Sequence, residues 1–239
     1  MTEKSWRSVL FYTRQENWLA TSSCLRKGIR IMKHKLRLQI GLLAVTILAF
    51  TVLTVFVTSG AAQSFNDRVY SEISLVIYPS VTSFMKVITN IGEWFVYIPF
   101  VLLLLMIPKS RIKVGLPAAY VLGAAAALNF LLKHLFHIDR PVAHRLIEET
   151  GYGYPSGHAM IGTAFVGVCL YLFCRYSYHK YLKVAVTILT VIFLMLEGFS
   201  RIYLGVHSPT DVIAGYLCGL IIVLVTILVI RSKDLNRIS

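Results

Sequence analysis

The stretch LQIGLLAVTILAFTVLTVFVT, residues 38–58, decides the fold class of this chain. It contains no charged residue and is long enough to cross a bilayer as a helix, which takes about 20 mostly apolar residues. Further apolar stretches follow at residues 91–107, 114–136, 158–174, 184–199 and 210–230. The sequence therefore predicts an all-α fold, a polytopic membrane helix bundle with six transmembrane helices.

The composition agrees with a membrane protein, since 56% of the 239 residues are hydrophobic, 15% are charged and the mean hydropathy is +0.69. Soluble domains carry about 25% charged residues, so these values exclude an ordinary soluble domain, and the apolar content excludes a disordered chain. The low cysteine content excludes a disulfide-rich secreted module. The four cysteines are expected to be unpaired, small apolar side chains: Cys24, Cys169, Cys174 and Cys218.

The net charge of +13 is distributed in a way that predicts how the helices are oriented. Most of the 24 lysines and arginines lie within residues 1–37, 109–113, 175–183 and 231–237, beside the ends of apolar stretches. Cytoplasmic loops carry an excess of such residues, and anionic lipids attract them. The pattern predicts cytoplasmic termini, an anionic lipid bilayer rather than nucleic acid as the partner, and a bacterial plasma membrane as the location.

The same boundaries divide the chain into a basic cytoplasmic tail (1–37), a six-helix transmembrane domain (38–230) and a cytoplasmic C-terminal tail (231–239). The first tail is expected to lie on the inner membrane surface or to be mostly disordered. Residues 59–90 form an outward-facing interfacial segment, in which apolar residues recur at helical spacing on both sides of Tyr78-Pro79. Two short amphipathic helices on the outer face are expected there, with a loop packed over the bundle as the alternative.

A group of basic residues lies outside the four clusters and on the outward side of the membrane. They are Arg68, Lys86, Lys133, Arg140, Arg145 and Arg201. Three histidines, His144, His158 and His207, fall on the same side. Charged side chains within a membrane are energetically costly and usually functional, so we expect the functional site to lie on this outward face.

Two helix starts on this face suit an anion and its chemistry. Ser156 and Gly157 open the fourth apolar stretch, where free backbone N–H groups can bind an anion and glycine lets a ligand approach the backbone. His158 follows them directly. His207 lies just before the start of the last stretch and four residues before Asp211. These positions combine a candidate anion site with two histidines and a carboxylate.

Lys133 and Arg140 add positive charge, and since Pro141 disfavours helix at Arg140, the loop can bend that side chain back toward Lys133. Taken singly, such residues have structural explanations: a snorkelling lysine, a helix-capping aspartate or a packed histidine. For Arg145 and His144 we keep the structural explanation. For the others, the convergence of three cations, two histidines and a carboxylate on one face outweighs it.

Together these residues resemble the three-part signature of the type-2 phosphatidic acid phosphatase family. The matching motifs are Lys133-x6-Arg140-Pro141, Pro155-Ser156-Gly157-His158 and Ser200-Arg201-x5-His207-x3-Asp211. The resemblance spans residues 38–230 and includes the six-helix arrangement. The family also includes vanadium haloperoxidases and bacterial lipid phosphatases of the phosphatidylglycerophosphate phosphatase B type.

The resemblance implies a phosphohydrolase that uses no metal ion and no other cofactor. His207 would attack phosphorus to give a phosphohistidine, Asp211 would orient the His207 ring, and His158 would protonate the leaving alcohol and then activate water. The residues implied for phosphate binding are Lys133, Arg140, Arg201, Ser156 and Gly157. The outward carboxylates show no spacing typical of a site for hard cations: Asp67, Glu72, Glu93, Asp139, Glu148, Glu149 and Asp211.

The implied function is that of an integral membrane lipid phosphate phosphatase. Phosphatidylglycerophosphate is the first choice of substrate, with undecaprenyl diphosphate and phosphatidic acid as alternatives, because the motifs bind phosphate and say little about the lipid tail. A lipid transporter is the alternative outside the enzymes, and six apolar stretches disfavour a haloperoxidase. The sequence does not tell which protein partners the chain has.

Three residues inside the apolar stretches remain. Glu197 is expected either to pair with a cation of the motifs or to lie protonated against a neighbouring helix. Gly215 and Gly219 share one face of the last helix and predict close packing against another helix.

Overall fold

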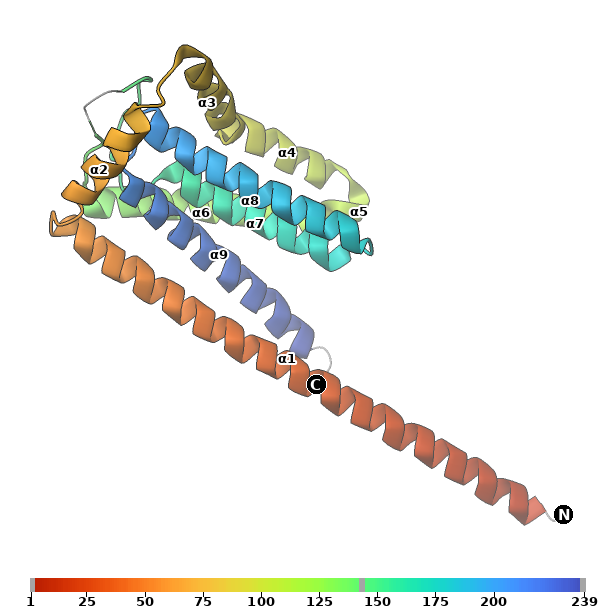
Figure 1. The fold of residues 1–239 in the computed structure, drawn as a ribbon. Helices are drawn as coiled ribbons and strands as arrows, with labels where there is room; N and C mark the ends of the chain where they lie inside the picture. The colour runs from red at the N-terminus through yellow and green to blue at the C-terminus, as the bar shows by residue number, and fades with distance from the viewer. Residues whose placement is uncertain (1–2, 142–144, 237–239) are drawn as a thin grey trace. The chain divides into compact units, whose positions relative to one another are not determined.

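The computed structural model describes residues 3–141 and 145–236, and every regular element within these ranges is a helix (Figure 1). In this part of the chain, six helical segments are long and apolar enough to cross a membrane, which confirms the predicted all-α architecture. Their bounds are Arg30–Thr58, Pro79–Met106, Pro108–Phe136, Gly157–Tyr176, Lys180–Tyr203 and Pro209–Asn236.

The helices correspond to the predicted stretches, and each of the six spans is longer than expected. The elements are α1 (Glu3–Thr58), α2 (Gln63–Ser74), α3 (Pro79–Ile91), α4 (Trp94–Met106), α5 (Pro108–Ser110), the π-helix η1 (Arg111–Gly115), α6 (Leu116–Phe136), α7 (Gly157–Tyr176), α8 (Lys180–Tyr203) and α9 (Pro209–Asn236). The second span exceeds residues 91–107 because α3 and α4 follow one another across a short break at Gly92 and Glu93. α8 exceeds residues 184–199 at both ends, and its last turn carries Arg201.

The chain divides into two compact units. One combines the chain up to Leu42 with the part from Leu228 onward, and within it Arg231 Nη1 donates a hydrogen bond to Gln39 Oε1 at 2.8 Å. α1 runs unbroken from Glu3, so the described part of the basic tail is helical and continuous with the first span. The other unit, residues 43–227, contains all of the predicted site residues.

Residues 59–90 contain the two short helices that the sequence predicts, α2 and α3, which are separated by residues 75–78. α3 is at the same time the first part of the second span. Pro79 lies in the first turn of α3, where its missing N–H leaves no hydrogen bond unmade. Buried Ile73 of α2 and Met85 of α3 pack against Tyr203 at the end of α8. The segment is therefore helical, and it also packs over one end of the bundle.

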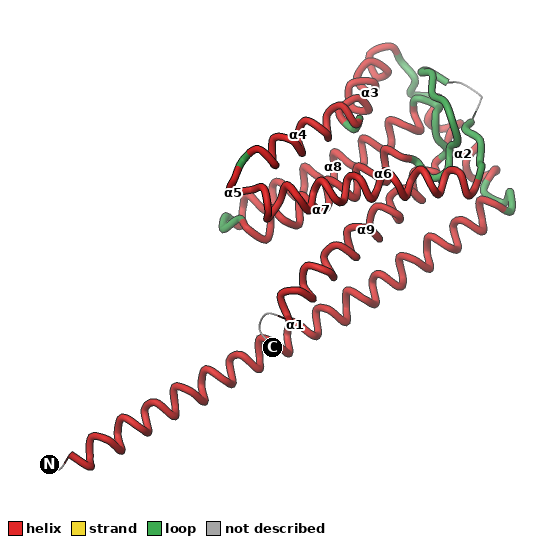
Figure 2. Tube along the Cα trace, turned by 180° about the vertical axis from the view of Figure 1, so that it is seen from behind, coloured by secondary structure: helices red, strands yellow, loops and turns green. Residues whose placement is uncertain are grey.

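Close packing around α7 determines how the helix ends meet. α6, α7 and α8 run side by side (Figure 2). α9 approaches α7 so closely that a Cβ atom on Gly215 would lie 2.7 Å from the backbone oxygen of Ser156, and one on Gly219 would lie 2.6 Å from the Cβ of Thr163. The predicted close packing at these two glycines is confirmed.

The thiols of Cys169, Cys174 and Cys218 are free. Cys169 packs in a core cluster that also contains Tyr97 and Phe165, and Cys218 is buried on α9, which agrees with the role of a small apolar side chain. The side chain of Cys24 lies outside the part of the chain that the structure describes.

Candidate active site

The ends of α6 and α8 and the starts of α7 and α9 lie near one cavity of about 530 Å³. Six of the eight residues predicted for the site line it: Lys133, Arg140, Gly157, His158, Arg201 and His207. The other two, Ser156 and Asp211, are buried beside it. The backbone N–H of Ser156 donates to the backbone oxygen of Asp211 at 3.0 Å, which ties the start of α7 to the start of α9.

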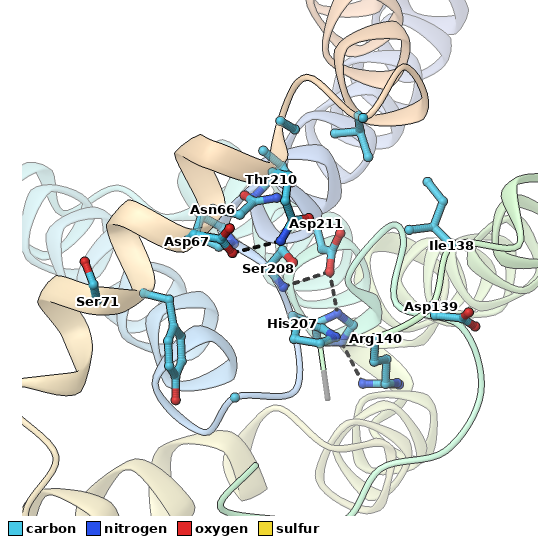
Figure 3. A pocket seen from close by; sticks show the side chains of 18 of the residues that line it. Asn66, Asp67, Ser71, Ile138, Asp139, Arg140, His207, Ser208, Thr210 and Asp211 are labelled. Atoms are coloured by element: carbon cyan, nitrogen blue, oxygen red, sulfur yellow. Dashed lines mark hydrogen bonds and ion pairs between the residues drawn. The ribbon is translucent and has the colours of Figure 1, made fainter. Parts of the chain in front are cut away.

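A second cavity, of about 660 Å³, shares Arg140 and His207 with the first (Figure 3). Its lining includes Asn66 and Asp67 of α2 and Asp211 of α9. Asn66 Oδ1 accepts a hydrogen bond from the backbone N–H of Thr210 at 3.3 Å, so α2 is joined to the first turn of α9. His207 therefore borders two cavities, one beside the motif cations and one beside α2.

His207 is held in the turn between α8 and α9, where Gly205 has a positive φ of 72°. Its Nδ1 lies 3.5 Å from Asp211 Oδ2 (Figure 3), and both side chains are buried. The same Oδ2 accepts the backbone N–H of Ser208 at 2.8 Å. Asp211 thus caps its helix, as its structural explanation expects, and the same carboxylate faces the His207 ring.

The two ring nitrogens of His207 have different partners, and this fixes the tautomer. Arg140 Nη1 lies 3.1 Å from His207 Nε2, and because a guanidinium only donates, Nε2 must accept. The ring proton is then on Nδ1, facing Asp211. Burial, followed by the positive charges of Arg140, Arg201 and Lys133, holds the pKa of His207 well below its ordinary value. Nε2 is therefore a buried nitrogen of a neutral ring, and it carries the lone pair that a nucleophilic histidine needs.

The loop between α6 and α7 draws the first two cations together, as the sequence predicts. Lys133 Nζ donates to the backbone oxygen of Tyr152 at 2.5 Å, and Arg140 Nε donates to that of Gly151 at 3.1 Å. The third cation, Arg201, donates from Nη1 to Thr89 Oγ1 of α3 at 2.7 Å. Each cation is thus held by the protein at one end and lines the cavity.

Glu149 bridges two of these cations, a contact that the sequence analysis missed. Its Oε1 lies 2.5 Å from Arg201 Nη2, and its Oε2 lies 3.4 Å from Arg140 Nη2. Burial alone would raise the pKa of Glu149, but the hydrogen bond from Arg201 and the charges of both arginines hold it below its ordinary value. An ionised carboxylate therefore lies between two arginines that suit a phosphate equally well.

The start of α7 has further polar atoms available to a ligand. Ser156 occupies the predicted N-cap position, but its hydroxyl makes no cap hydrogen bond. Ser156 Oγ and Arg201 Nε are buried and have no hydrogen-bond partner among the described residues. A Cβ atom on Gly157 would lie 3.0 Å from Asn129 Oδ1, so a larger residue there would press on the Asn129 side chain. Oxygens of a bound anion would satisfy both unpaired groups.

His158 has a carboxylate partner that motif spacing does not reveal. Its Nε2 lies 3.2 Å from Oε1 of Glu93, at the junction of α3 and α4. From the sequence, Glu93 is only one of the outward carboxylates.

The remaining predicted residues have structural roles or lie elsewhere. Arg145 Nε donates to the backbone oxygen of Pro141 at 2.6 Å, which agrees with its structural explanation, and His144 lies outside the described residues. Glu197 is buried, accepts a hydrogen bond from Tyr97 at 3.2 Å and pairs with no motif cation, so it lies against a neighbouring helix. Among the described residues, no group of three or more His, Cys, Asp or Glu side chains could hold a metal ion.

Comparisons with known proteins show the family to which the chain belongs. Residues 114–234 match the model of the PAP2 superfamily. Phosphatidylglycerophosphatase B of Bacillus subtilis is 29% identical over 181 residues, which cover 73% of this chain and 88% of that protein. Undecaprenyl-diphosphatase of Sulfolobus acidocaldarius is 28% identical over 184 residues, which cover 73% and 84%.

Solved structures are similar as well. The crystal structure of a transmembrane PAP2 type phosphatidylglycerolphosphate phosphatase from Bacillus subtilis has a TM-score of 0.72 and 26% sequence identity, and the match covers 80% of this chain and 96% of that one. The crystal structure of LpxE from Aquifex aeolicus, at 22% identity and a TM-score of 0.56, shares the fold over 68% of this chain and 94% of that one.

Proposed function

Since the chain belongs to the PAP2 superfamily, we propose that it is an integral membrane phosphatase that hydrolyses the phosphomonoester of phosphatidylglycerophosphate. The products are phosphatidylglycerol and inorganic phosphate. The main support for the proposal is that one cavity is lined both by His207, the buried nucleophile, with three cations and by apolar side chains. Undecaprenyl diphosphate and phosphatidic acid are the alternative substrates, and the similarity to an undecaprenyl-diphosphatase supports the first of these.

The phosphate binds between Lys133, Arg140 and Arg201, together with the N–H groups at the start of α7. Arg140 and Arg201 exchange the carboxylate of Glu149 for phosphate oxygens, which suit their planar donors equally well. The same exchange frees Nε2 of His207 from Arg140, so that its lone pair can face phosphorus.

Catalysis then takes two in-line displacements at phosphorus. In the first, His207 Nε2 forms a bond to phosphorus, the bond to the lipid alcohol breaks, and His158 gives that oxygen a proton. Asp211 stabilises the positive charge that develops on the His207 ring. In the second, His158 takes a proton from water, the water oxygen bonds to phosphorus, and the bond to His207 breaks. Phosphate leaves, and both histidines return to their starting states.

The walls of the cavity explain why the substrate is a lipid. Trp94, Ile98 and Leu102 of α4 line it, and the same side chains are exposed on the surface of the bundle. Ala119 and Leu122 of α6 form the facing wall. Because these helices are membrane spans, the apolar mouth opens toward the hydrocarbon, where the acyl chains of a substrate lie.

We place the site on the outer face of a bacterial plasma membrane, with both termini in the cytoplasm. The catalytic histidines lie at the helix ends opposite the basic clusters at 109–113 and 175–183. The positive-inside rule assigns those clusters to the cytoplasm. The basic tail and the anionic inner leaflet attract each other in this arrangement.

Phosphate release by the purified protein in detergent tests the proposal. Phosphatidylglycerophosphate, phosphatidic acid and undecaprenyl diphosphate are supplied in parallel, with His207→Ala as the control and thermal unfolding as the check that the variant is folded. We expect release from phosphatidylglycerophosphate at the highest kcat/KM and none from the variant. A higher kcat/KM for either other lipid would overturn the substrate assignment, and release by folded His207→Ala would overturn the mechanism.

A further inference from the structure

Glu93 lies outside the three motifs and outside the matched family region, yet its side chain lines the active-site cavity. It occupies the N-cap position of α4 with an extended backbone, but its carboxylate makes no capping hydrogen bond. Its Oε1 is 3.2 Å from His158 Nε2 instead. The His158 side chain is 13% exposed and that of Glu93 is 25% exposed, so the pair is largely shielded from solvent.

From this geometry we propose that Glu93 is the positioning residue for His158. His158 then forms a second carboxylate–histidine pair, beside the pair formed by His207 and Asp211. This inference rests on the proposed phosphatase function and adds a residue to it. With Nε2 engaged by Glu93, Nδ1 is the nitrogen left to exchange a proton with the leaving alcohol and with water.

The two pairs serve opposite ends of the same displacement. Asp211 stabilises the charge that develops on the nucleophile, and Glu93 keeps the His158 ring oriented while its proton is transferred. The other charged or titratable groups that line this cavity are Tyr97, Lys133, Arg140, Glu149, Arg201 and His207. Three of them are cations that disfavour a protonated His158, so a carboxylate in direct contact is what supports the acid form.

The junction that carries Glu93 is held in place by α8. Glu197 lies directly against Gly92, where any Cβ atom would collide with its carboxyl group, and it also accepts the hydroxyl of Tyr97. One turn later, Arg201 donates to Thr89 at the end of α3. Two residues of α8 therefore fix both sides of the α3–α4 break, and the position of Glu93 with it.

The test compares Glu93→Gln with wild type on two phosphate esters that differ in their leaving groups. The lipid substrate has a poorly acidic alcohol that needs a proton, whereas p-nitrophenyl phosphate has a leaving group that departs without one. The quantity measured is kcat/KM, which covers the steps up to departure of the leaving group. Glu72→Gln, an exposed carboxylate of α2, is the matched control.

We expect Glu93→Gln to lower kcat/KM for the lipid at least about tenfold, part of the roughly 10²–10⁴-fold that a general acid contributes, and to leave p-nitrophenyl phosphate nearly unchanged. Glu93→Asp should recover part of the loss. In the His158→Ala background, Glu93→Gln should have no further effect on the lipid. Equal losses on both esters, or a full additional loss in the double variant, would overturn the assignment.

The outcomes also separate this inference from the proposed function. If Glu93→Gln behaves as wild type while His207→Ala is inactive, the phosphatase stands and the role of Glu93 is refuted. If His207→Ala remains active on the lipid, the proposed function itself fails, whatever Glu93→Gln does.

Discussion

The reactivity of single residues at this site comes from their neighbours. His207 is buried, faces a carboxylate through Nδ1 and accepts a hydrogen bond from Arg140 through Nε2. Arg140 and Arg201 in turn share one carboxylate, Glu149. A neutral imidazole next to several cations is a good nucleophile toward a phosphate, because those cations also attract and neutralise the electrophile.

The pH dependence of phosphoenzyme formation should reflect the lowered pKa of His207. His207 must be neutral to attack, and its depressed pKa keeps it neutral below the ordinary value of about 6.5. With p-nitrophenyl phosphate, which needs no acid, the rate of formation should stay constant as pH falls through about 6.5 and decline only in more acidic solution. Stopped-flow measurement of nitrophenolate release checks this, and half-loss of the rate near pH 6.5 would contradict it.

Glu149→Gln should make inorganic phosphate and vanadate better competitive inhibitors. The carboxylate competes with these anions for Arg140 and Arg201, and the neutral amide competes less. We expect the inhibition constants to fall about tenfold, which corresponds to about 1.4 kcal/mol. Glu148→Gln, an exposed neighbour, is the control and should change neither constant. Weaker inhibition of Glu149→Gln would instead mean that Glu149 holds the arginines in position for the ligand.

At the scale of helices, the approach of α9 to α7 determines whether the site is assembled. Gly219→Ala places a methyl group where Thr163 and the backbone of Met160 already lie, and such overpacking costs about 1–3 kcal/mol. The unfolding temperature in detergent and the phosphatase rate should both fall, because Ser156 and Asp211 are joined across this contact. Gly41→Ala on α1, where nothing lies within 4 Å, should lower neither. If Gly219→Ala unfolded at the same temperature as the wild-type protein, the helix packing described here would be refuted.

The apolar stretches predicted the helices well, because length and hydropathy suffice for a membrane span. The prediction failed where a helix carries charge inside the protein. α8 continues to Tyr203 although Arg201 is charged, since Thr89 and Glu149 pair with its two terminal nitrogens, Nη1 and Nη2. A hydropathy criterion ends such a helix too early, because it cannot anticipate partners from distant parts of the chain.

The motifs predicted which side chains come together for a related reason, since short spacings at helix starts fix the geometry of His207 and Asp211. Their carboxylate neighbours have no such spacing. Glu149 and Arg201 are 52 residues apart, and Glu93 comes from a helix junction outside the motifs. Only the packed bundle brings them together, so their roles could not be read from the sequence.

For the whole molecule, the account predicts catalysis without a metal ion. The charges that neutralise phosphate are Lys133, Arg140 and Arg201, and the nucleophile is a side chain. Phosphate release from the lipid should therefore be unchanged in excess EDTA and should not rise on addition of Mg²⁺. Loss of activity in EDTA that Mg²⁺ restores would contradict the mechanism.

Trapping the covalent intermediate on His207 tests whether this histidine forms a bond to phosphorus. His158→Ala should accumulate the phosphoenzyme from p-nitrophenyl phosphate, because its formation needs no acid whereas its hydrolysis needs the missing base. The measurement is rapid quenching at alkaline pH followed by mass spectrometry of the peptides. The account predicts a phosphate on His207, labile in acid and absent from the His158→Ala/His207→Ala double variant. Turnover by wild type with no phosphate on His207 in either protein, or with phosphate on another residue, would contradict it.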